Sequence, residues 1–320
     1  MSSAESWTIG RLLKWTTDYL KAHGSESPRL DAEVLLAETL GCQRIDLYTR
    51  FDETPNDEVR AAFRDFVRRR AEGMPVAYLV GRREFYSLSF RVTPDVLIPR
   101  PETELLVVAV LDSAKNMLHR TPSSQIEERQ SEKSASLKTT SEVAPTRKGI
   151  AVADVGTGSG IIAVCLAKHL PDCRVMAIDV SQKALAVAAD NARRHGVAER
   201  ICFVESDLFA AVPSEQRFDI IVSNPPYVTE AEMERLTVDV RRFEPRGALV
   251  SGPLGTEVIE RLIPQAAAHL LPGGHLLMEV SPTIHDRVYS LLEADGRFEP
   301  GPTIKDLARL PRIVQGRRRE

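Results

Sequence analysis

The chain has 320 residues, 43% of them hydrophobic and 27% charged, and its 42 basic and 45 acidic side chains leave a net charge of −3. This composition is typical of a globular protein of one or two domains, and its balanced charge does not favour a nucleic-acid binder, which usually presents a basic face. The four cysteines form no C-x-x-C pair and the seven histidines have no metal-ligand spacing, so we expect reduced thiols, no metal site and a cytoplasmic protein.

Residues 1–80 are predicted to form a small helical domain. Apolar residues recur at helical spacing over Ile9–Leu20 and Leu30–Leu36, which indicates amphipathic helices. We interpret the basic cluster Arg68-Arg69-Arg70 as a solvated face near a helix end. The N-terminus has no basic segment followed by an apolar one, and no apolar run is long enough to span a bilayer, so we expect neither a signal peptide nor a membrane partner.

Residues 81–100 are predicted to form a β-hairpin that links two domains. The segment Glu84–Thr93 alternates like a strand, and Val96-Leu97-Ile98 follows it after the turn signal Pro94-Asp95. The next segment, Pro99–Glu104, places prolines and acidic residues where helices typically start, which predicts a helix that runs to about Leu118.

Residues 101–320 are predicted to form a doubly wound α/β domain with a mostly parallel sheet, because apolar runs alternate with helical periodicity from residue 150 onward. Residues 121–149 are polar and contain no aromatic residue, so we predict a disordered insertion there. The predicted strands are Ile150–Val155, Arg174–Val180, Ile201–Glu205, Phe218–Ser223 and His275–Val280, with Phe298–Thr303 and Arg312–Gln315 as candidates to close the sheet. The predicted helices are Ile161–Leu170, Lys183–His195, Val258–Leu271 and Ile284–Ala294, with Pro272-Gly273-Gly274 as a turn.

A glycine-rich turn follows the first of these strands and predicts a ligand site. Its candidate binding residues are Gly156, Thr157, Gly158, Ser159 and Gly160. The spacing is G-x-G-x-G, whereas the dinucleotide fingerprint is G-x-G-x-x-G and the phosphate-binding P-loop needs a Gly-Lys-Ser/Thr that is missing here. A turn without phosphate-binding groups suits a ligand without phosphate, such as S-adenosylmethionine.

Acidic residues follow the next two strands. Asp179 ends the second strand, where a carboxylate can accept hydrogen bonds from both ribose hydroxyls; the alternative is a helix N-cap, although Ser181 is also placed for that role. Asp207 follows the third strand and could accept a hydrogen bond from an adenine amino group, with Leu208 or Phe209 packing on the ring. The ends of parallel strands meet at one edge of a sheet, so we expect these residues to lie together.

The fourth strand ends in Asn224-Pro225-Pro226-Tyr227. Two prolines stop a strand, because they lack the N–H group that a ladder needs, and they hold the backbone rigid. The Asn224 side chain is therefore displayed at the ligand-binding edge of the sheet as a neutral donor and acceptor. This favours chemistry on an amide or an exocyclic amine, while the alternative interpretation is a plain turn.

In these motifs the chain resembles the peptide chain release factor glutamine N5-methyltransferases, the PrmC/HemK family. The resemblance covers nearly everything except residues 121–149 and depends on Arg83-Glu84-Phe85-Tyr86, Leu97–Glu104, Asp154–Gly160, Ser206–Phe209, Ser223–Tyr227 and Glu244-Pro245. It implies a class I methyltransferase domain that uses S-adenosylmethionine, and a helical domain that engages the release factor. The implied methyl acceptor is the glutamine of the factor's Gly-Gly-Gln motif.

The sequence departs from the family pattern at the loops Ser251–Gly255 and Arg309-Leu310-Pro311, and at Ser281 and Ile284. These departures concern the substrate side rather than the methyl-transfer chemistry. Two further residues, Arg100 and Glu102, either cap the helix after Pro99 or take part in the cofactor site.

A carboxamide nitrogen is a weak nucleophile, so positioning matters more than proton abstraction. We expect the Asn224 side-chain carbonyl and the Pro225 backbone carbonyl each to accept one N–H of the substrate amide, with Pro226 holding the turn and Tyr227 packing on the amide plane. The open alternatives are a ribosomal-protein glutamine methyltransferase, an N6-adenine methyltransferase acting on DNA or RNA, and a non-catalytic binding protein. We expect a monomer that makes no direct contact with nucleic acid.

Overall fold

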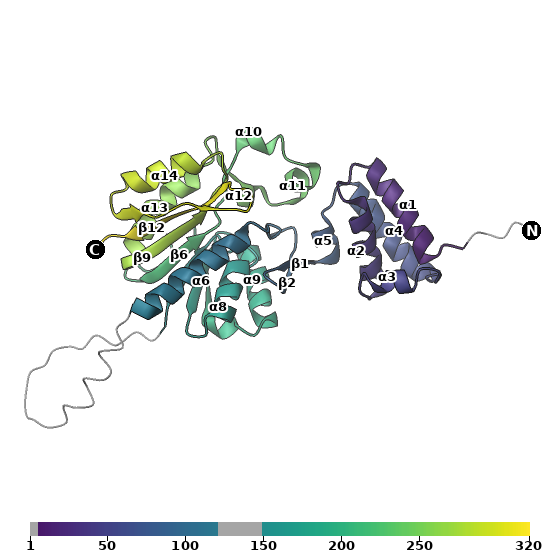
Figure 1. Cartoon of the computed structure of the whole chain (residues 1–320), viewed down its shortest axis with the longest axis horizontal. Helices are drawn as coiled ribbons and strands as arrows, with labels where there is room; N and C mark the ends of the chain where they lie inside the picture. Colours follow the sequence, from purple (N-terminus) through teal and green to yellow (C-terminus); the bar gives the residue numbers. More distant parts are fainter. Residues whose placement is uncertain (1–5, 121–148) are drawn as a thin grey trace, which may run out of the picture.

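The computed structural model describes residues 6–120 and 149–320. The predicted insertion at 121–149 therefore lies, apart from Gly149, outside the described residues. A helical bundle occupies one end of the molecule and a helix-covered sheet the other, with α5 and a small hairpin between them (Figure 1). Within the described residues, no helix combines the length and the apolar character that a membrane span requires.

Four helices form the N-terminal bundle around an apolar cluster, and a fifth, α5, packs on it through Leu79 and leads to the hairpin. Side chains of Thr8 and Asn56 accept hydrogen bonds from backbone N–H groups three residues later and so cap two of the helices. The helices are α1 (Ile9–Ala22), α2 (Pro28–Leu40), α3 (Asp46–Thr49), α4 (Asp57–Ala71) and α5 (Val76–Val80). The large buried side chains of this cluster include Leu13, Leu20, Leu35, Leu36 and Phe63.

The interpretation of Arg68-Arg69-Arg70 as a solvated face is wrong for its last member. The Arg70 Nε lies 2.7 Å from Asp31 Oδ2, and the two side chains are only 14% and 12% exposed. This ion pair joins α4 to α2 from positions far apart in the sequence. Arg68 does face solvent at 68% exposure.

The linking hairpin exists, but its turn lies elsewhere than predicted. Strand β1 (Arg82–Phe85) pairs antiparallel with β2 (Leu88–Arg91), so the predicted single strand Glu84–Thr93 folds back on itself. The turn residues Tyr86 and Ser87 have φ of 50° and 58°, a conformation that tight hairpins favour but that usually selects Gly or Asn. The Tyr86 N–H donates to Glu104 Oε1 at 2.9 Å, which holds the turn against the larger domain.

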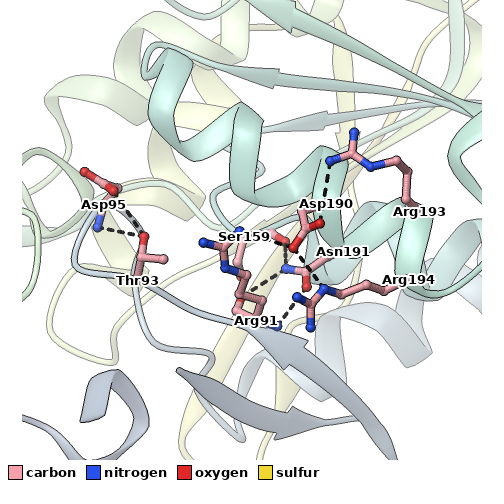
Figure 2. A network of polar contacts seen from close by, with 8 residues as sticks. All are labelled: Arg91, Thr93, Asp95, Ser159, Asp190, Asn191, Arg193 and Arg194. Carbon is pink, nitrogen blue, oxygen red and sulfur yellow. Dashed lines mark hydrogen bonds and ion pairs between the residues drawn. The ribbon is translucent and has the colours of Figure 1, made fainter. Parts of the chain in front are cut away.

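One buried asparagine fastens this hairpin to the sheet domain (Figure 2). The Asn191 side chain, 0% exposed, accepts from the Arg91 N–H at 2.8 Å and donates to the Arg91 carbonyl at 3.0 Å. Its Nδ2 also donates to the Ser159 carbonyl at 2.8 Å. The same side chain therefore ties β2 to the glycine-rich turn, and Asp190 adds ion pairs to Arg91 and Arg194 on the outside.

The larger domain confirms the predicted doubly wound, mostly parallel sheet. Its strand order is β10-β12-β9-β6-β3-β4-β5, with β11 paired to β12. Strands β9, β6, β3, β4 and β5 are parallel, and β12 runs antiparallel to β9 and β10. The strands are β3 (Ala151–Val155), β4 (Arg174–Asp179), β5 (Ile201–Glu205), β6 (Phe218–Ser223), β9 (Leu270–Glu279), β10 (Phe298–Pro300), β11 (Ile304–Lys305) and β12 (Pro311–Arg318).

Helices cover both faces of the sheet (Figure 1). Side chains of α6 and α8 belong to the apolar cluster on one face, and those of α13 and α14 to the cluster on the other. The main helices are α6 (Thr103–Arg120), α8 (Ile161–His169), α9 (Gln182–Arg194), α13 (Glu257–His269) and α14 (His285–Ala294), with the short η1 (Ala198–Arg200). Between β6 and α13 lie β7 (Val228–Thr229), α10 (Glu230–Met233), α11 (Val238–Phe243), α12 (Arg246–Leu249) and β8 (Val250–Gly252).

The predicted turn Pro272-Gly273-Gly274 is instead part of strand β9. The pairing register of β9 against β6 shifts between Phe218–Leu270 and Ile220–His275, so the three residues form an irregular bulge within one long strand. Strand β3 lies between β4 on one side and β6 on the other, so the order in which strands are added to the sheet reverses at β3. The carboxyl ends of β3 and β6 therefore flank the crevice where such sheets bind ligands.

Candidate active site

A cavity of about 280 Å³ lies at these strand ends, close to the lower limit of the roughly 300–1,000 Å³ of small-molecule sites. Most of the predicted site residues line it: Gly156, Thr157, Gly158, Ser159, Asp179, Asp207, Leu208, Asn224, Pro225, Pro226 and Arg100. Three predicted residues are not among its lining: Gly160, Glu102 and Tyr227. Within the described residues, no group of three or more His, Cys, Asp or Glu side chains could hold a metal ion.

The glycine-rich turn presents bare backbone to the cavity. Gly156 and Gly158 have φ of 76° and 55°, and a Cβ built on either would meet no atom closer than 3.8 Å. The N–H groups of Gly156 and Thr157 both donate to the Ile178 carbonyl. They therefore cannot cradle a phosphate, and the space that a side chain would fill suits a ligand without phosphate.

A buried carboxylate supports the turn from below. Asp154 is 0% exposed, and its Oδ2 accepts from the Thr157 hydroxyl at 2.6 Å and from the Ala163 N–H at 3.1 Å. Burial raises the pKa of Asp154 to about 7. Its bonds join the turn to the first residues of α8 and so fix the shape of the cavity floor.

Asp179 occupies the predicted place at the end of β4. Its Oδ2 accepts from the Gly158 N–H and its Oδ1 from the Ser181 N–H, both at 2.9 Å. Ser181 caps α9 through the Ala184 N–H, so the N-cap role considered for Asp179 belongs to Ser181. Each carboxylate oxygen retains a lone pair for a ligand hydroxyl, and burial raises the pKa of Asp179 above its ordinary range.

Asp207 lines the cavity but also faces outward. Its carboxylate pairs with Arg261 on α13, and its side chain is 56% exposed. An adenine amino group would have to share this carboxylate with a cation. Leu208, which is 8% exposed and has a φ of 53°, lines the cavity beside it, in keeping with the predicted packing role.

Arg100 lines the cavity and forms a buried ion pair, whereas Glu102 does neither within the described part of the chain. The Arg100 Nη2 lies 2.6 Å from Glu244 Oε1, and Glu244 Oε2 also accepts from the Ile98 N–H at 3.2 Å. The Glu244 side chain is 1% exposed, and burial raises its pKa despite the guanidinium. Arg100 thus clamps two walls of the cavity together, whereas Glu102 precedes α6 outside the cavity lining.

Asn224 sits at the cavity rim in one defined orientation. Its Nδ2 donates to the Thr103 Oγ1 at 3.1 Å, and within residues 6–120 and 149–320 no donor is recorded for its Oδ1. The Tyr227 hydroxyl donates to Glu279 Oε1 at 3.4 Å. Tyr227 therefore stands behind Asn224 rather than in the cavity wall, and its predicted packing on a substrate amide stays a prediction.

Sequence reasoning overlooked three residues at this site. Thr103 and Val180 line the cavity, and Val180 is 69% exposed although it is apolar. Glu279 is 2% exposed at the end of β9. Sequence signals could have indicated two of them: Val180 is an apolar residue directly after Asp179, and Glu279 is an acid inside the apolar run of β9.

Two of the departures from the family pattern have local explanations. Ser251 Oγ accepts from the Val258 N–H at 3.0 Å. Ile284 is 5% exposed and packs in an apolar cluster. Arg309 has a φ of 63°, a backbone conformation that usually selects glycine, and Leu254 is half exposed; nothing in the structure explains these two substitutions.

Comparison with known proteins identifies the family. Residues 11–81 match the family described as PrmC N-terminal domain, and residues 137–244 match the methyltransferase small domain. The release factor glutamine methyltransferase of Rhodopirellula baltica is 48% identical, with 98% of this chain and 97% of that protein covered. The corresponding protein of Geobacter sulfurreducens is 39% identical, with 98% of each chain covered. These findings confirm the resemblance and the class I methyltransferase fold, and the chain belongs to the release factor glutamine methyltransferase family.

Proposed function

We propose that this enzyme transfers a methyl group from S-adenosylmethionine to the side-chain amide nitrogen of the glutamine in the Gly-Gly-Gln motif of a peptide chain release factor. The observation that carries the proposal is the Asn224 amide, which turns its nitrogen to Thr103 and its oxygen away from it. A neutral acceptor at the rim of a cofactor-sized cavity suits an amide substrate. The names of the relatives support the same acceptor.

The cavity residues would hold the cofactor by three kinds of contact. Gly156 and Gly158 offer close backbone approach, the Asp179 carboxylate offers acceptors for ribose hydroxyls, and Leu208 offers an apolar face for the adenine. Asp207 would accept from the adenine amino group. When bound, S-adenosylmethionine would supply an electrophilic methyl group on a sulfonium, with the thioether as the leaving group for transfer to nitrogen.

The protein's part in the reaction is to hold the amide nitrogen. The Asn224 Oδ1 and the Pro225 backbone carbonyl each accept one N–H, which aligns the nitrogen lone pair with the methyl group and favours the positive charge that develops on nitrogen. Pro225 and Pro226 keep that carbonyl still. The methylated nitrogen then loses one proton to water.

We propose residues 1–80 as the domain that recognises the release factor, residues 81–100 as the link, and residues 101–320 as the methyltransferase domain. The match of residues 11–81 to the PrmC N-terminal domain supports this division. Gly73 lies against Val238 and Phe243 of α11, and Pro245 shortly after lines the cavity. A factor held by the helices would therefore lie beside the cavity rim. We further propose a cytoplasmic monomer that needs no nucleic acid.

Labelled S-adenosylmethionine tests the proposal directly. The protein is incubated with a purified release factor, with the same factor carrying Gln→Ala in its Gly-Gly-Gln motif, with a ribosomal protein fraction and with DNA. We expect label on the intact factor alone. Label on the ribosomal proteins or on DNA would replace the proposed acceptor with a ribosomal glutamine or an adenine.

A further inference from the structure

A chain of buried hydrogen bonds runs behind the amide of Asn224. The Asn224 Nδ2 donates to the Oγ1 of Thr103, the first residue of α6, at 3.1 Å. The Thr103 side chain is 0% exposed, and its hydroxyl acts as a hydrogen-bond donor that lowers the pKa of the Glu279 carboxylate at the end of β9. Three elements distant in the sequence therefore meet at one hydroxyl group.

While Glu279 is ionised, the proton count of this chain allows only one arrangement. A threonine hydroxyl has one proton, and an ionised carboxylate can only accept. The Thr103 proton therefore points to Glu279, and Thr103 can only accept from Asn224. Consequently the NH₂ group of Asn224 must face Thr103, and its Oδ1 must face the other way.

The orientation matters because the two ends of a carboxamide have nearly the same shape. A flipped Asn224 would present an NH₂ group to the NH₂ group of a substrate amide, so that two donors would face each other. The hydrogen-bond partners of a carboxamide, rather than its packing, therefore decide which way its oxygen and its NH₂ group point.

We infer that Glu279, acting through the hydroxyl of Thr103, is a positioning residue that fixes the Asn224 carbonyl toward the substrate amide; this rests on the proposed function. Neither side chain needs to touch the reacting atoms. Their effect is to keep the acceptor end of Asn224 in place before the substrate arrives.

The surroundings of Glu279 make this arrangement sensitive to pH. The Tyr227 hydroxyl donates to its Oε1, Glu102 and Arg312 act on it through their charges, and its Oε2 has no partner among the described residues. Burial raises the pKa of Glu279 to about 7. Below that pH a protonated Glu279 can donate to Thr103, which frees the Thr103 proton for Asn224 Oδ1 and permits the flip.

The test compares Thr103→Val, which removes the hydroxyl but keeps the shape, with Thr103→Ser, which keeps the hydroxyl. With the release factor as substrate, we expect Thr103→Val to lower kcat on the order of 10- to 100-fold, because an unpaired buried NH₂ group disfavours the productive orientation. Thr103→Ser should recover most of that loss. The dissociation constant of S-adenosylmethionine, measured by calorimetry, should stay within about threefold in both variants. The wild-type kcat should fall below about pH 7, and Thr103→Val should lack that step.

Equal kcat values for the valine and serine variants, or a pH step that persists in Thr103→Val, would overturn the inference. If Thr103→Val does not fold, Thr103→Ala replaces it in the same comparison. A wild type that labels no release-factor glutamine overturns the proposed function and this inference with it. An active wild type with indistinguishable Thr103 variants overturns the inference alone.

Discussion

Replacement of Asp179 by asparagine isolates the contribution of one carboxylate to cofactor binding. Asp179 accepts from the N–H groups of Gly158 and Ser181, one on each oxygen, and lines the cavity. Asparagine has the same shape but only one acceptor oxygen, so in either orientation its NH₂ group faces a backbone N–H and one ribose hydroxyl loses its acceptor. We therefore expect a variant that folds but binds S-adenosylmethionine weakly.

The size of the effect follows from the bonds that are lost. A hydrogen bond to a charged group contributes about 1.5–3 kcal/mol, and Asp179→Asn removes at least one such bond to the ribose and weakens the other. The dissociation constant should rise by roughly 10- to 150-fold, since 1.4 kcal/mol is a factor of about ten. The effect on stability should be smaller, because burial already raises the pKa of Asp179 and so makes its charged form costly in the folded protein.

The same carboxylate predicts a pH dependence of binding. In the proposed site the ionised form accepts the ribose hydroxyls, and burial raises the pKa of Asp179 above its ordinary value. Affinity should therefore be complete above that raised pKa and should fall as the pH falls through it. The asparagine variant has nothing to protonate at this position, so this contribution to the pH dependence should disappear.

Isothermal titration calorimetry with S-adenosylmethionine measures both effects. Asp190→Asn is the matched control, because it makes the same chemical change on the outer side of α9, where Asp190 pairs with Arg91 and Arg194 and does not line the cavity. The control should bind within about twofold of the wild type, as expected of surface substitutions. A dissociation constant for Asp179→Asn within threefold of the wild type would refute the ribose-binding role.

Three further predictions concern the rest of the site. Asn224→Ala should lower single-turnover methyl transfer on the order of 100-fold or more while cofactor binding changes little; near-normal turnover would exclude its assigned role. Arg100→Met leaves the buried Glu244 carboxylate without its cation and should lower the free energy of unfolding in urea by about 2–3 kcal/mol. This is less than the roughly 3–5 kcal/mol for a fully buried pair, because Arg100 is 31% exposed. The control Arg68→Met, on an exposed arginine, should lower it by under about 0.5 kcal/mol, and equal losses in the two variants would contradict the clamp. Asn191→Leu removes the partners of β2 and of the glycine-rich turn and should speed hydrogen exchange in both; an unchanged exchange pattern would argue against this coupling.

The parallel sheet could be predicted because each of its strands is encoded locally. A strand buried on both faces reads as an uninterrupted apolar run, as Phe218–Ser223 does, and this strand and the edge strand Ile201–Glu205 match the structure at both ends. The hairpin turn at Tyr86-Ser87 could not, because its left-handed backbone is held by Glu104 from α6 rather than by a residue type that favours turns. The Arg70–Asp31 pair escaped prediction for a similar reason, since its partners lie 39 residues apart.

The site shows the same division between local and distant determinants. Asp179 and Asn224 could be placed together from sequence because both end parallel strands, and such ends converge at one edge. Glu279 also ends a strand of this sheet, but its meaning depends on Thr103, which comes from a helix. An acid within an apolar run signals a buried partner; only the folded chain identifies which one.

The choice of a neutral side chain at position 224 follows from how charge moves in methyl transfer. The positive charge begins on the sulfonium and ends on the amide nitrogen, so a carboxylate beside both would stabilise the starting state as well as the transition state. An aspartate at 224 would also place a second carboxylate on the Thr103 hydroxyl, whose single proton is already directed to Glu279. One of the two acids would have to take up a proton. In the proposed mechanism asparagine supplies the acceptor without the charge, and the hydroxyl of Thr103 lies between the Glu279 carboxylate and the amide that faces the substrate.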